Sequence, residues 1–233
     1  DVQNREVPTS HDLVTDYSYN SLQQLLRQNT PDGNETHFYY NQIGQLRFSR
    51  NARQQEDGTY AYMKYDALGR IVEIGEGSDE VDNLMSYIEQ INFPEVNVWE
   101  RTLTFYTDPS DITYLDTGVY PQRYLQNRVS SNCYDEDGNL DTPEDQVTTY
   151  YSYDPHGNVE WLAQELPYLG RCFIAYNYDL VSGNVLEVRY NEGQRDQFFH
   201  RYGYDADNRI TTVETSTDGQ ICDEDATYSY YAH

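Results

Sequence analysis

Lysine is almost absent from this chain of 233 residues. Lys64 is the only lysine, and 15 Lys and Arg residues stand against 40 Asp and Glu residues, which gives a formal net charge of −25. A surface that neutralises nucleic-acid phosphates needs clustered cations, so the composition argues against nucleic-acid binding. The same charge is repelled by anionic membrane surfaces, and the sequence has no run of about 20 apolar residues that could span a membrane.

Cysteine is also scarce. Cys133, Cys172 and Cys222 have neither the paired spacing of a zinc site nor the density of a disulfide framework, and at least one must be unpaired within the chain. The first residues do not have the charged and then apolar pattern of a signal peptide, and neither end carries a lipidation motif. We therefore expect any export signal to lie outside these residues.

Tyrosine, in contrast, is abundant. There are 25 Tyr, 14 Gly and 8 Pro, against only 2 Met and 7 Phe. Disordered acidic chains are poor in aromatic residues, so this chain is predicted to fold. Large rings with polar tips suit twisted sheets whose faces are partly exposed to water, and the composition predicts an all-β protein.

A short motif that begins with Tyr-Asp recurs along the chain. Complete copies are Tyr65-Asp66-Ala67-Leu68-Gly69-Arg70-Ile71, Tyr134-Asp135-Glu136-Asp137-Gly138-Asn139-Leu140 and Tyr153-Asp154-Pro155-His156-Gly157-Asn158-Val159. Degenerate copies begin at Tyr19, Tyr40, Tyr178-Asp179 and Tyr204-Asp205. The last of these keeps the basic residue as Arg209 and has Asn208 in the place of the glycine. The period is roughly 25 residues, which indicates a repeat protein.

Each repeat can be interpreted as a β-hairpin. A second aromatic residue often lies two places before the repeat tyrosine, as in Tyr176 and Tyr178, and this spacing places both rings on one face of a strand. The Asp-x-x-Gly segment then predicts a turn in which the aspartate accepts backbone hydrogen bonds and the glycine adopts a positive φ. We expect Arg70 and Arg209 to pair with the aspartate of their own turn and to stack on the rings.

These Tyr-Asp-x-x-Gly-Arg/Asn-aliphatic units resemble the Tyr-Asp (YD) repeats of the rearrangement-hotspot (RHS) family, whose relatives include insecticidal toxin-complex subunits and the teneurins. The resemblance covers nearly the whole chain and is carried by Tyr19, Tyr40, Tyr65, Asp66, Gly69, Arg70, Tyr134, Asp135, Gly138, Tyr153, Asp154, Gly157, Tyr178, Asp179, Tyr204, Asp205 and Arg209. It implies consecutive hairpins in a curved, spiralling sheet that forms part of a hollow shell around a C-terminal toxin or other cargo.

The resemblance also implies an organisation and a role. We expect one YD-repeat β-ribbon over 1–233, with an insertion at 75–133. The residues of the insertion themselves predict a short helix at about 79–91, because Ser78 can cap it and the apolar residues are spaced as a helical stripe: Val81, Leu84, Met85, Ile88 and Ile91. Alternation from 96 to 106 predicts further strands. Shell-forming members are much longer, so the chain is expected to be a structural, non-enzymatic segment of a larger bacterial protein, secreted or at the cell surface. Its partners would be the rest of that polypeptide and the C-terminal polymorphic toxin that it encapsulates or presents.

Two motifs suggest chemistry. Asp154-Pro155-His156-Gly157 matches the Asp-Pro-x-Gly string of RHS shells that cut themselves, but the repeat turn explains the same residues, and no second converging acid is evident. Oxygen ligands of the kind that calcium prefers gather at Asp135, Asp137 and Asp141, and this is the only cofactor site that we expect. The five histidines lack zinc-ligand spacing.

Exposed tyrosine rings also stack on sugars. The alternative interpretation is therefore an extracellular adhesion or carbohydrate-binding module of the teneurin type. Rings that recur at the repeat spacing more often pack against the same rings in neighbouring hairpins, where each cross-strand pair contributes about 0.2–1 kcal/mol. The sequence favours the structural role.

Overall fold

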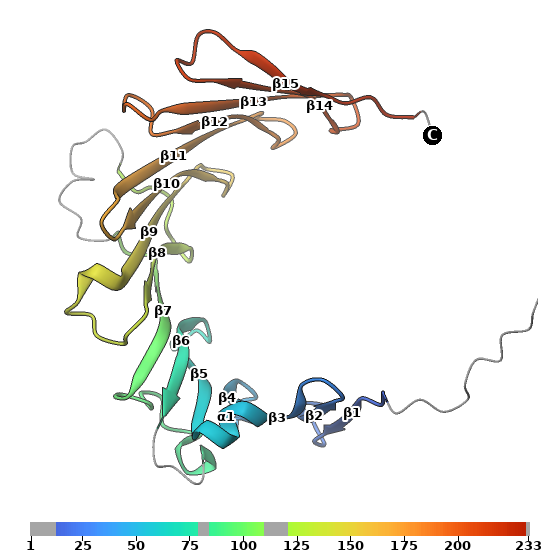
Figure 1. Ribbon diagram of the computed structural model, residues 1–233, viewed down its shortest axis with the longest axis vertical. Coiled ribbons are helices and arrows are strands. Elements are labelled where there is room, and N and C mark those ends of the chain that lie inside the picture. The colour runs from blue at the N-terminus through green and yellow to red at the C-terminus, as the bar shows by residue number, and fades with distance from the viewer. Residues whose placement is uncertain (1–12, 79–83, 110–120, 232–233) are drawn as a thin grey trace, which may run out of the picture. The chain divides into compact units, whose positions relative to one another are not determined.

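The computed structural model describes residues 13–78, 84–109 and 121–231. The described residues contain fifteen strands and few helical turns (Figure 1). The strands are β1 Asp16–Tyr19, β2 Leu25–Thr30, β3 Asn34–Tyr40, β4 Leu46–Asn51, β5 Thr59–Tyr65, β6 Ile71–Ser78, β7 Val98–Tyr106, β8 Val129–Asp135, β9 Gln146–Tyr153, β10 Val159–Leu166, β11 Gly170–Tyr178, β12 Val185–Tyr190, β13 Phe198–Tyr204, β14 Ile210–Ser216 and β15 Asp223–Thr227. The helical elements are α1 Ala52–Asp57 and the 3₁₀ turns η1 Leu84–Tyr87 and η3 Pro143–Asp145.

The strands follow one another in the sheet in the order in which they occur in the chain. The order runs from β1 to β15 without a crossover, and the sheet is antiparallel and not closed. This arrangement confirms the all-β prediction and the expectation that successive hairpins are neighbours. The curvature and spiral implied by the resemblance remain predictions.

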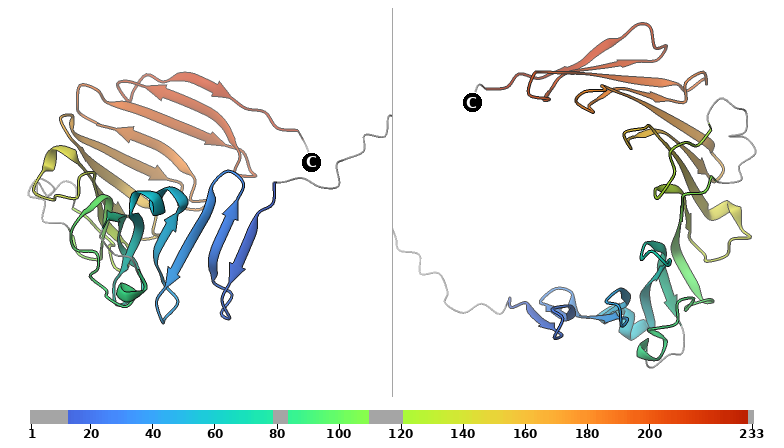
Figure 2. Two further views of the ribbon diagram at one scale, coloured as in Figure 1. Left: turned by 60° about the horizontal axis from the view of Figure 1, so that its bottom comes forward. Right: turned by 180° about the vertical axis from the view of Figure 1, so that it is seen from behind.

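The chain divides into two compact units. The first comprises Asp1–Leu103 with Asp135–Asn139, and the second comprises Thr104–Tyr134 with Leu140–His233. In the first unit, Phe48, Tyr60 and Tyr62 are buried together with Leu84 and Ile88. A sheet layer buries such rings only when something covers them, and here the described residues of the β6–β7 connection, which include η1, lie against the strands (Figure 2).

The second unit has its own smaller core on a series of hairpins. Trp161 on β10 pairs with Ala175 on β11, and Ala163 pairs with Tyr150 on β9. These four side chains are buried, and Phe173 packs against them. Large rings opposite alanines fill the space above the sheet without overlap.

Six of the seven Tyr-Asp hairpins contain a β-bulge beside the repeat tyrosine. Lys64 pairs with Glu73 while Tyr65 pairs with Ile71, which leaves Val72 as the extra residue. The hairpins of Tyr178 and Tyr204 show the same register shift. A bulge increases local twist, so the repeat imposes the same distortion in each of these hairpins.

The faces of the second unit differ in charge between β11 and β14. By register, Glu187, Arg201 and Glu214 lie on one face, where Arg201 and Glu187 form an ion pair of 2.8 Å. Tyr176 and Val188 are paired on the opposite face. Successive side chains of a strand point to opposite faces of the sheet. Charged residues at every second position therefore lie on one face, and the uncharged residues between them lie on the other.

The helix predicted at 79–91 is wrong for the described part of that range. Residues 79–83 lie outside the described residues, and the chain then forms only the 3₁₀ turn η1 at Leu84–Tyr87. Leu84 and Ile88 are buried against the sheet, whereas Ile91 is exposed. Two apolar residues with helical spacing therefore pack onto the sheet from a 3₁₀ turn and the position after it. The strand predicted after this segment is confirmed as β7.

A helix that was not predicted lies between β4 and β5. Asn51 accepts a hydrogen bond from the Gln54 amide at 2.8 Å, the Gln54 side chain accepts one from the Asn51 amide, and Gly58 ends α1 at φ 73°. Asn51-x-x-Gln54 is a capping box, a signal that the sequence does contain. Among the described residues, no helix is both long and apolar enough to cross a bilayer.

Candidate functional site

The most regular feature of the described residues is the turn that follows six of the seven repeat tyrosines. In the Asp66 turn, the Asp66 amide donates to the Arg70 carbonyl at 2.9 Å and the Gly69 amide donates to the Asp66 carbonyl at 3.0 Å. The same pair of backbone bonds closes the turns that begin at Asn20, Asn41, Asp154, Asp179 and Asp205. One local geometry therefore recurs at six places in the described chain.

The aspartate side chain stabilises this turn from inside. The Asp66 carboxylate accepts hydrogen bonds from the amides of Leu68 and Arg70, both at 2.9 Å, and from Arg70 Nε at 2.7 Å. Asp205 makes the equivalent bonds to Asp207 and Arg209. The backbone hydrogen bonds, together with the arginine, lower the pKa of both carboxyls. The ion pairs expected for Arg70 and Arg209 are thus present, and Arg209 also lies over the Tyr230 ring at 4.6 Å.

The glycine of the turn adopts the left-handed backbone conformation. The φ angles are 79° at Gly69, 81° at Gly138 and 98° at Gly157, so the predicted positive φ values are confirmed. Gln23 and Asn208 take the same position in the degenerate copies, with φ of 62° each. The Asp179 turn has one additional residue, which it accommodates by hydrogen bonds from the Ser182 amide and hydroxyl to the carboxylate at 2.8 and 2.6 Å.

The Asp-Pro-x-Gly copy has the bonding of a structural turn. The Asp154 carboxylate accepts from the Gly157 amide at 2.7 Å and from the Asn158 amide and side chain, both at 2.9 Å. Burial raises the pKa of Asp154, but the hydrogen bonds from Asn158 and the backbone outweigh burial and hold that pKa below its usual value. An acid that must donate a proton in catalysis needs the opposite shift.

The Asp135 turn is the buried variant of the motif. Asp135 is fully buried, and Arg101 Nε donates to it at 2.6 Å, while Arg101 Nη2 donates to the Gly138 carbonyl at 2.9 Å. A Cβ on Gly138 would lie 1.7 Å from the Val98 carbonyl oxygen, so no other residue fits there without movement. The Glu100 amide completes the contact by donating to the Glu136 carbonyl at 2.8 Å. The turn is thereby joined to β7.

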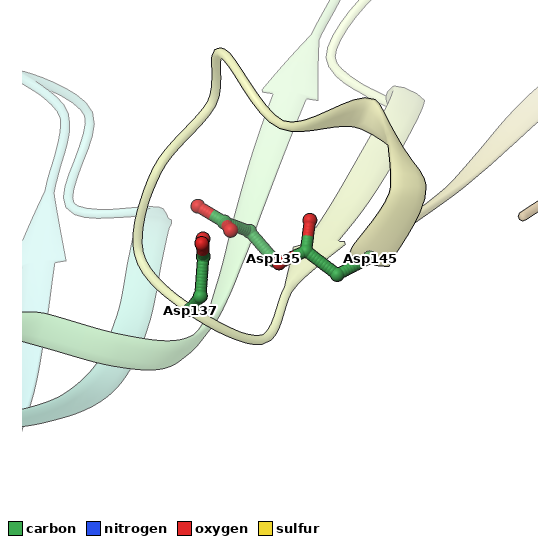
Figure 3. A group of neighbouring side chains, drawn as sticks. All are labelled: Asp135, Asp137 and Asp145. Atoms are coloured by element: carbon green, nitrogen blue, oxygen red, sulfur yellow. The ribbon is translucent and has the colours of Figure 1, made fainter.

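The same loop contains the carboxylates that suggested calcium. Asp135 and Asp137 have carboxylate oxygens within 4.8 Å of each other, and the third member of this group is Asp145 rather than the predicted Asp141 (Figure 3). Asp145 follows in η3, further along the loop. Arg101 forms an ion pair with the buried Asp135. The positive charge of Arg101 therefore offsets the negative charge of one of the three carboxylates. A calcium site here remains a prediction from sequence.

Five tyrosines at the repeat spacing connect their segment of the chain to an earlier strand. Tyr65 Oη donates to the Leu46 carbonyl at 2.8 Å, Tyr178 Oη to Val159 at 2.8 Å, and Tyr204 Oη to Val185 at 2.8 Å. Tyr153 and Tyr230 make equivalent bonds to the carbonyls of Val129 and Ile210. In each case the acceptor lies at or beside the beginning of an earlier strand. Burial raises the pKa of Tyr65, Tyr153, Tyr178 and Tyr204.

The predicted pairing of rings on one sheet face is present as well. The ring centroids of Tyr176 and Tyr178 are 6.2 Å apart and stacked, and those of Tyr17 and Tyr19 are 6.5 Å apart. Tyr134, the residue before the end of β8, has an exposed side chain. Most of these tyrosines thus make contacts within the sheet. In Tyr178, for example, the hydroxyl bonds a backbone carbonyl and the ring stacks on a neighbouring ring.

Sequence reasoning did not identify two arginines that hold distant segments. Arg101 reaches Asp135 across 34 residues, and Arg47 bonds the carbonyls of Met63, Ile88, Gln90 and Phe93. Neither position is part of the repeat motif. The sequence does contain one signal for such a residue. An arginine between two apolar residues, as in Leu46-Arg47-Phe48, indicates a cation in a buried position.

Comparisons with known proteins give distant likenesses. No family model and no curated protein matches the chain. It is similar to a crystal structure of TcdB2-TccC3, with 14% identity and a TM-score of 0.39 over 93% of this chain and 12% of that one. It is also similar to the structure of a Photorhabdus luminescens Tc holotoxin pore, with 13% identity and a TM-score of 0.38 over 88% of this chain and 11% of that one. The chain therefore spans about an eighth of the length of these structures, and at this identity and TM-score the likeness does not assign a function.

Proposed function

We propose that the chain is a structural segment of an RHS/YD-repeat shell in a larger bacterial protein, secreted or at the cell surface. The shell would encapsulate or present a C-terminal polymorphic toxin. The observation that carries this proposal is the recurring hydroxyl bond from Tyr65, Tyr153, Tyr178, Tyr204 and Tyr230 to the first residue of an earlier strand. A unit that attaches to its predecessor by the same bond each time can extend a sheet over a long distance.

The chemistry of the motif supports a structural role. The acidic groups of the turns at Asp66, Asp154 and Asp205 are occupied by backbone amides and by neighbouring side chains. Their pKa values are lowered, which is the direction expected for carboxylates that accept several hydrogen bonds in a structural turn. The recurring hydrogen bonds of the six turns connect the two strands of each hairpin.

Limited proteolysis of the complete natural polypeptide tests the proposal. The region that follows this chain should resist added protease until the shell is opened. A double variant, Tyr178→Phe with Tyr204→Phe, removes two ties between hairpins and should expose that region at a lower urea concentration than in the wild type. Tyr168→Phe, at an exposed turn, is the matched control and should leave protection unchanged. Rapid digestion with the shell intact would contradict encapsulation.

One observation favours the adhesion alternative. Tyr17 and Tyr19 on β1 are both exposed, and neighbouring exposed rings are a surface on which sugars stack. A glycan array with the wild-type chain and with Tyr17→Ala and Tyr19→Ala separates the two functions. The shell proposal expects no specific binder. A defined glycan that is lost from both variants would favour a carbohydrate-binding module.

A further inference from the structure

The segment between η1 and β7 forms a groove in the first unit. Three adjoining depressions, of about 600, 420 and 450 Å³, each have Ile91 in their lining. Glu89, Glu95 and Val96 line one or two of them, and Ile43 and Leu68 line the second. We call this surface, defined by Ile43, Leu68, Glu89, Ile91, Glu95 and Val96, the Ile91 groove. It is the surface on which the insertion meets two successive Tyr-Asp turns.

Aliphatic side chains are unusually exposed in the Ile91 groove. Ile91 is 71% exposed, Ile43 is 79% exposed and Leu68 is 72% exposed. Ile43 and Leu68 occupy the same position in consecutive turns, where the turn geometry requires no apolar residue. A contiguous group of exposed aliphatic residues that lines a depression is typical of an interaction site.

The charges around the groove are not balanced. Lys64 pairs with Glu73, Asp66 pairs with Arg70, and the buried Arg47 is bound by backbone carbonyls. Glu89 accepts a hydrogen bond from the Gln42 amide at 2.8 Å. Within the described part of the chain, no cationic side chain forms an ion pair with Glu89 or Glu95. Arg47, which also lines the second depression, is a cation whose charge acts on Glu89. The lining of the three depressions therefore carries four carboxylates, Asp66, Glu73, Glu89 and Glu95, against two cations, Arg47 and Lys64.

We propose that the Ile91 groove binds a segment of a different protein that carries aliphatic side chains alternating with Lys or Arg. The aliphatic side chains would fill the depressions beside Ile91, and the cations would pair with Glu89 and Glu95. A second copy of this chain is a poor occupant because each copy has 15 Lys and Arg against 40 Asp and Glu, a net charge of −25. Nucleic acid and anionic lipid are repelled by the same carboxylates. This proposal does not depend on the shell function.

Titration of a synthetic peptide of alternating leucine and lysine into the 233-residue chain tests the inference. Binding should be saturable at about 0.15 M salt, where surface charges more than about 8 Å apart are screened. Ile91→Asp should weaken affinity at least about tenfold, the equivalent of 1.4 kcal/mol. Glu89→Gln with Glu95→Gln should weaken it about threefold and reduce its dependence on salt. A peptide of alternating leucine and glutamate should not bind.

Leu180→Asp is the control for general electrostatic attraction. It adds the same negative charge as Ile91→Asp, at an exposed aliphatic side chain of another turn in the second unit. It should leave peptide affinity unchanged, and circular dichroism should show that all variants remain folded. Three results would each overturn the proposal: the absence of saturable binding, equal affinity for Ile91→Asp and Leu180→Asp, or binding of phosphatidylserine vesicles in place of the peptide.

Discussion

Arg101 on β7 holds the fully buried carboxylate of Asp135, with 2.6 Å between Nε and Oδ2, although 34 residues separate them in sequence. The same guanidinium bonds the Gly138 carbonyl, so one side chain joins a strand both to the motif aspartate and to the motif glycine. In the Asp66 and Asp205 turns the arginine comes from the turn itself. The Asp135 turn therefore depends on a partner supplied from elsewhere in the chain.

Removing this buried partner should be costly. Asp135→Ala leaves Arg101 with an uncompensated charge in a largely buried position, and we expect a loss of about 3 kcal/mol in the free energy of unfolding, measured by urea denaturation. Asp207→Ala, at an exposed ion pair with Arg209, should change that free energy by less than about 1 kcal/mol. Equal effects of the two substitutions would contradict the structural importance of Asp135.

Gly138 should be the least replaceable glycine of the turns. Gly183→Ala places a Cβ in open space at φ 74°, so it should cost about 1–2 kcal/mol from backbone conformation alone. Gly138→Ala has a similar φ of 81° and must also displace the Val98 carbonyl, which adds about 1–3 kcal/mol. Thermal unfolding of both variants measures the difference. A similar melting temperature for the two would show that the contact with Val98 is not rigid.

Each tyrosine hydroxyl bond between strands should contribute to the stability of the folded chain. Tyr178→Phe deletes the bond to the Val159 carbonyl and keeps the ring, so we expect a loss of about 1 kcal/mol in the free energy of unfolding. The urea midpoint should fall without a change in the slope of the transition. Tyr168→Phe, whose side chain is exposed, should leave the midpoint unchanged.

Stability should decline in acid through the turn aspartates. Hydrogen bonds to the backbone lower the pKa of Asp66 and Asp205 in the folded chain. Their contribution is therefore complete above the unfolded-state pKa of about 3.9 and is lost as the pH falls through the lower folded-state pKa. Asp66→Asn should reduce the pH dependence of the urea midpoint in this range, because Asn20 and Asn41 begin equivalent turns without a titrating group. An unchanged acid profile would count against the assigned hydrogen bonds.

The substitution Asp154→Ala distinguishes a structural role of Asp154 from a catalytic role. The loss of the bonds to Gly157 and Asn158 should cost about 1 kcal/mol in the free energy of unfolding, and the variant should remain folded. The mass of the polypeptide should be the same for the wild type and the variant after prolonged incubation. Cleavage in the wild type that is absent from the variant would show that Asp154 is catalytic.

The local structure of this protein could be predicted from its sequence because the interactions that form it lie within a few residues. The Asp66 turn is closed between residues 66 and 70, and the positive φ of Gly69 follows from that closure. The alternation that brings Tyr176 and Tyr178 together is a property of any strand. Seven copies of one motif, each needing a neighbour, also predicted the order of the hairpins.

Only the tertiary structure decided which long-range contacts complete the molecule. Leu84 and Ile88 have helical spacing, but they pack onto the Phe48 and Tyr60 rings, and burial against the sheet outweighs the weak helix preference of a short segment. The partner of Asp135 is Arg101, and Asp145 rather than Asp141 joins its acidic group, since both contacts depend on how separate segments meet. A repeat motif specifies the bonds within each unit, whereas burial between distant segments depends on the folded arrangement of all of them.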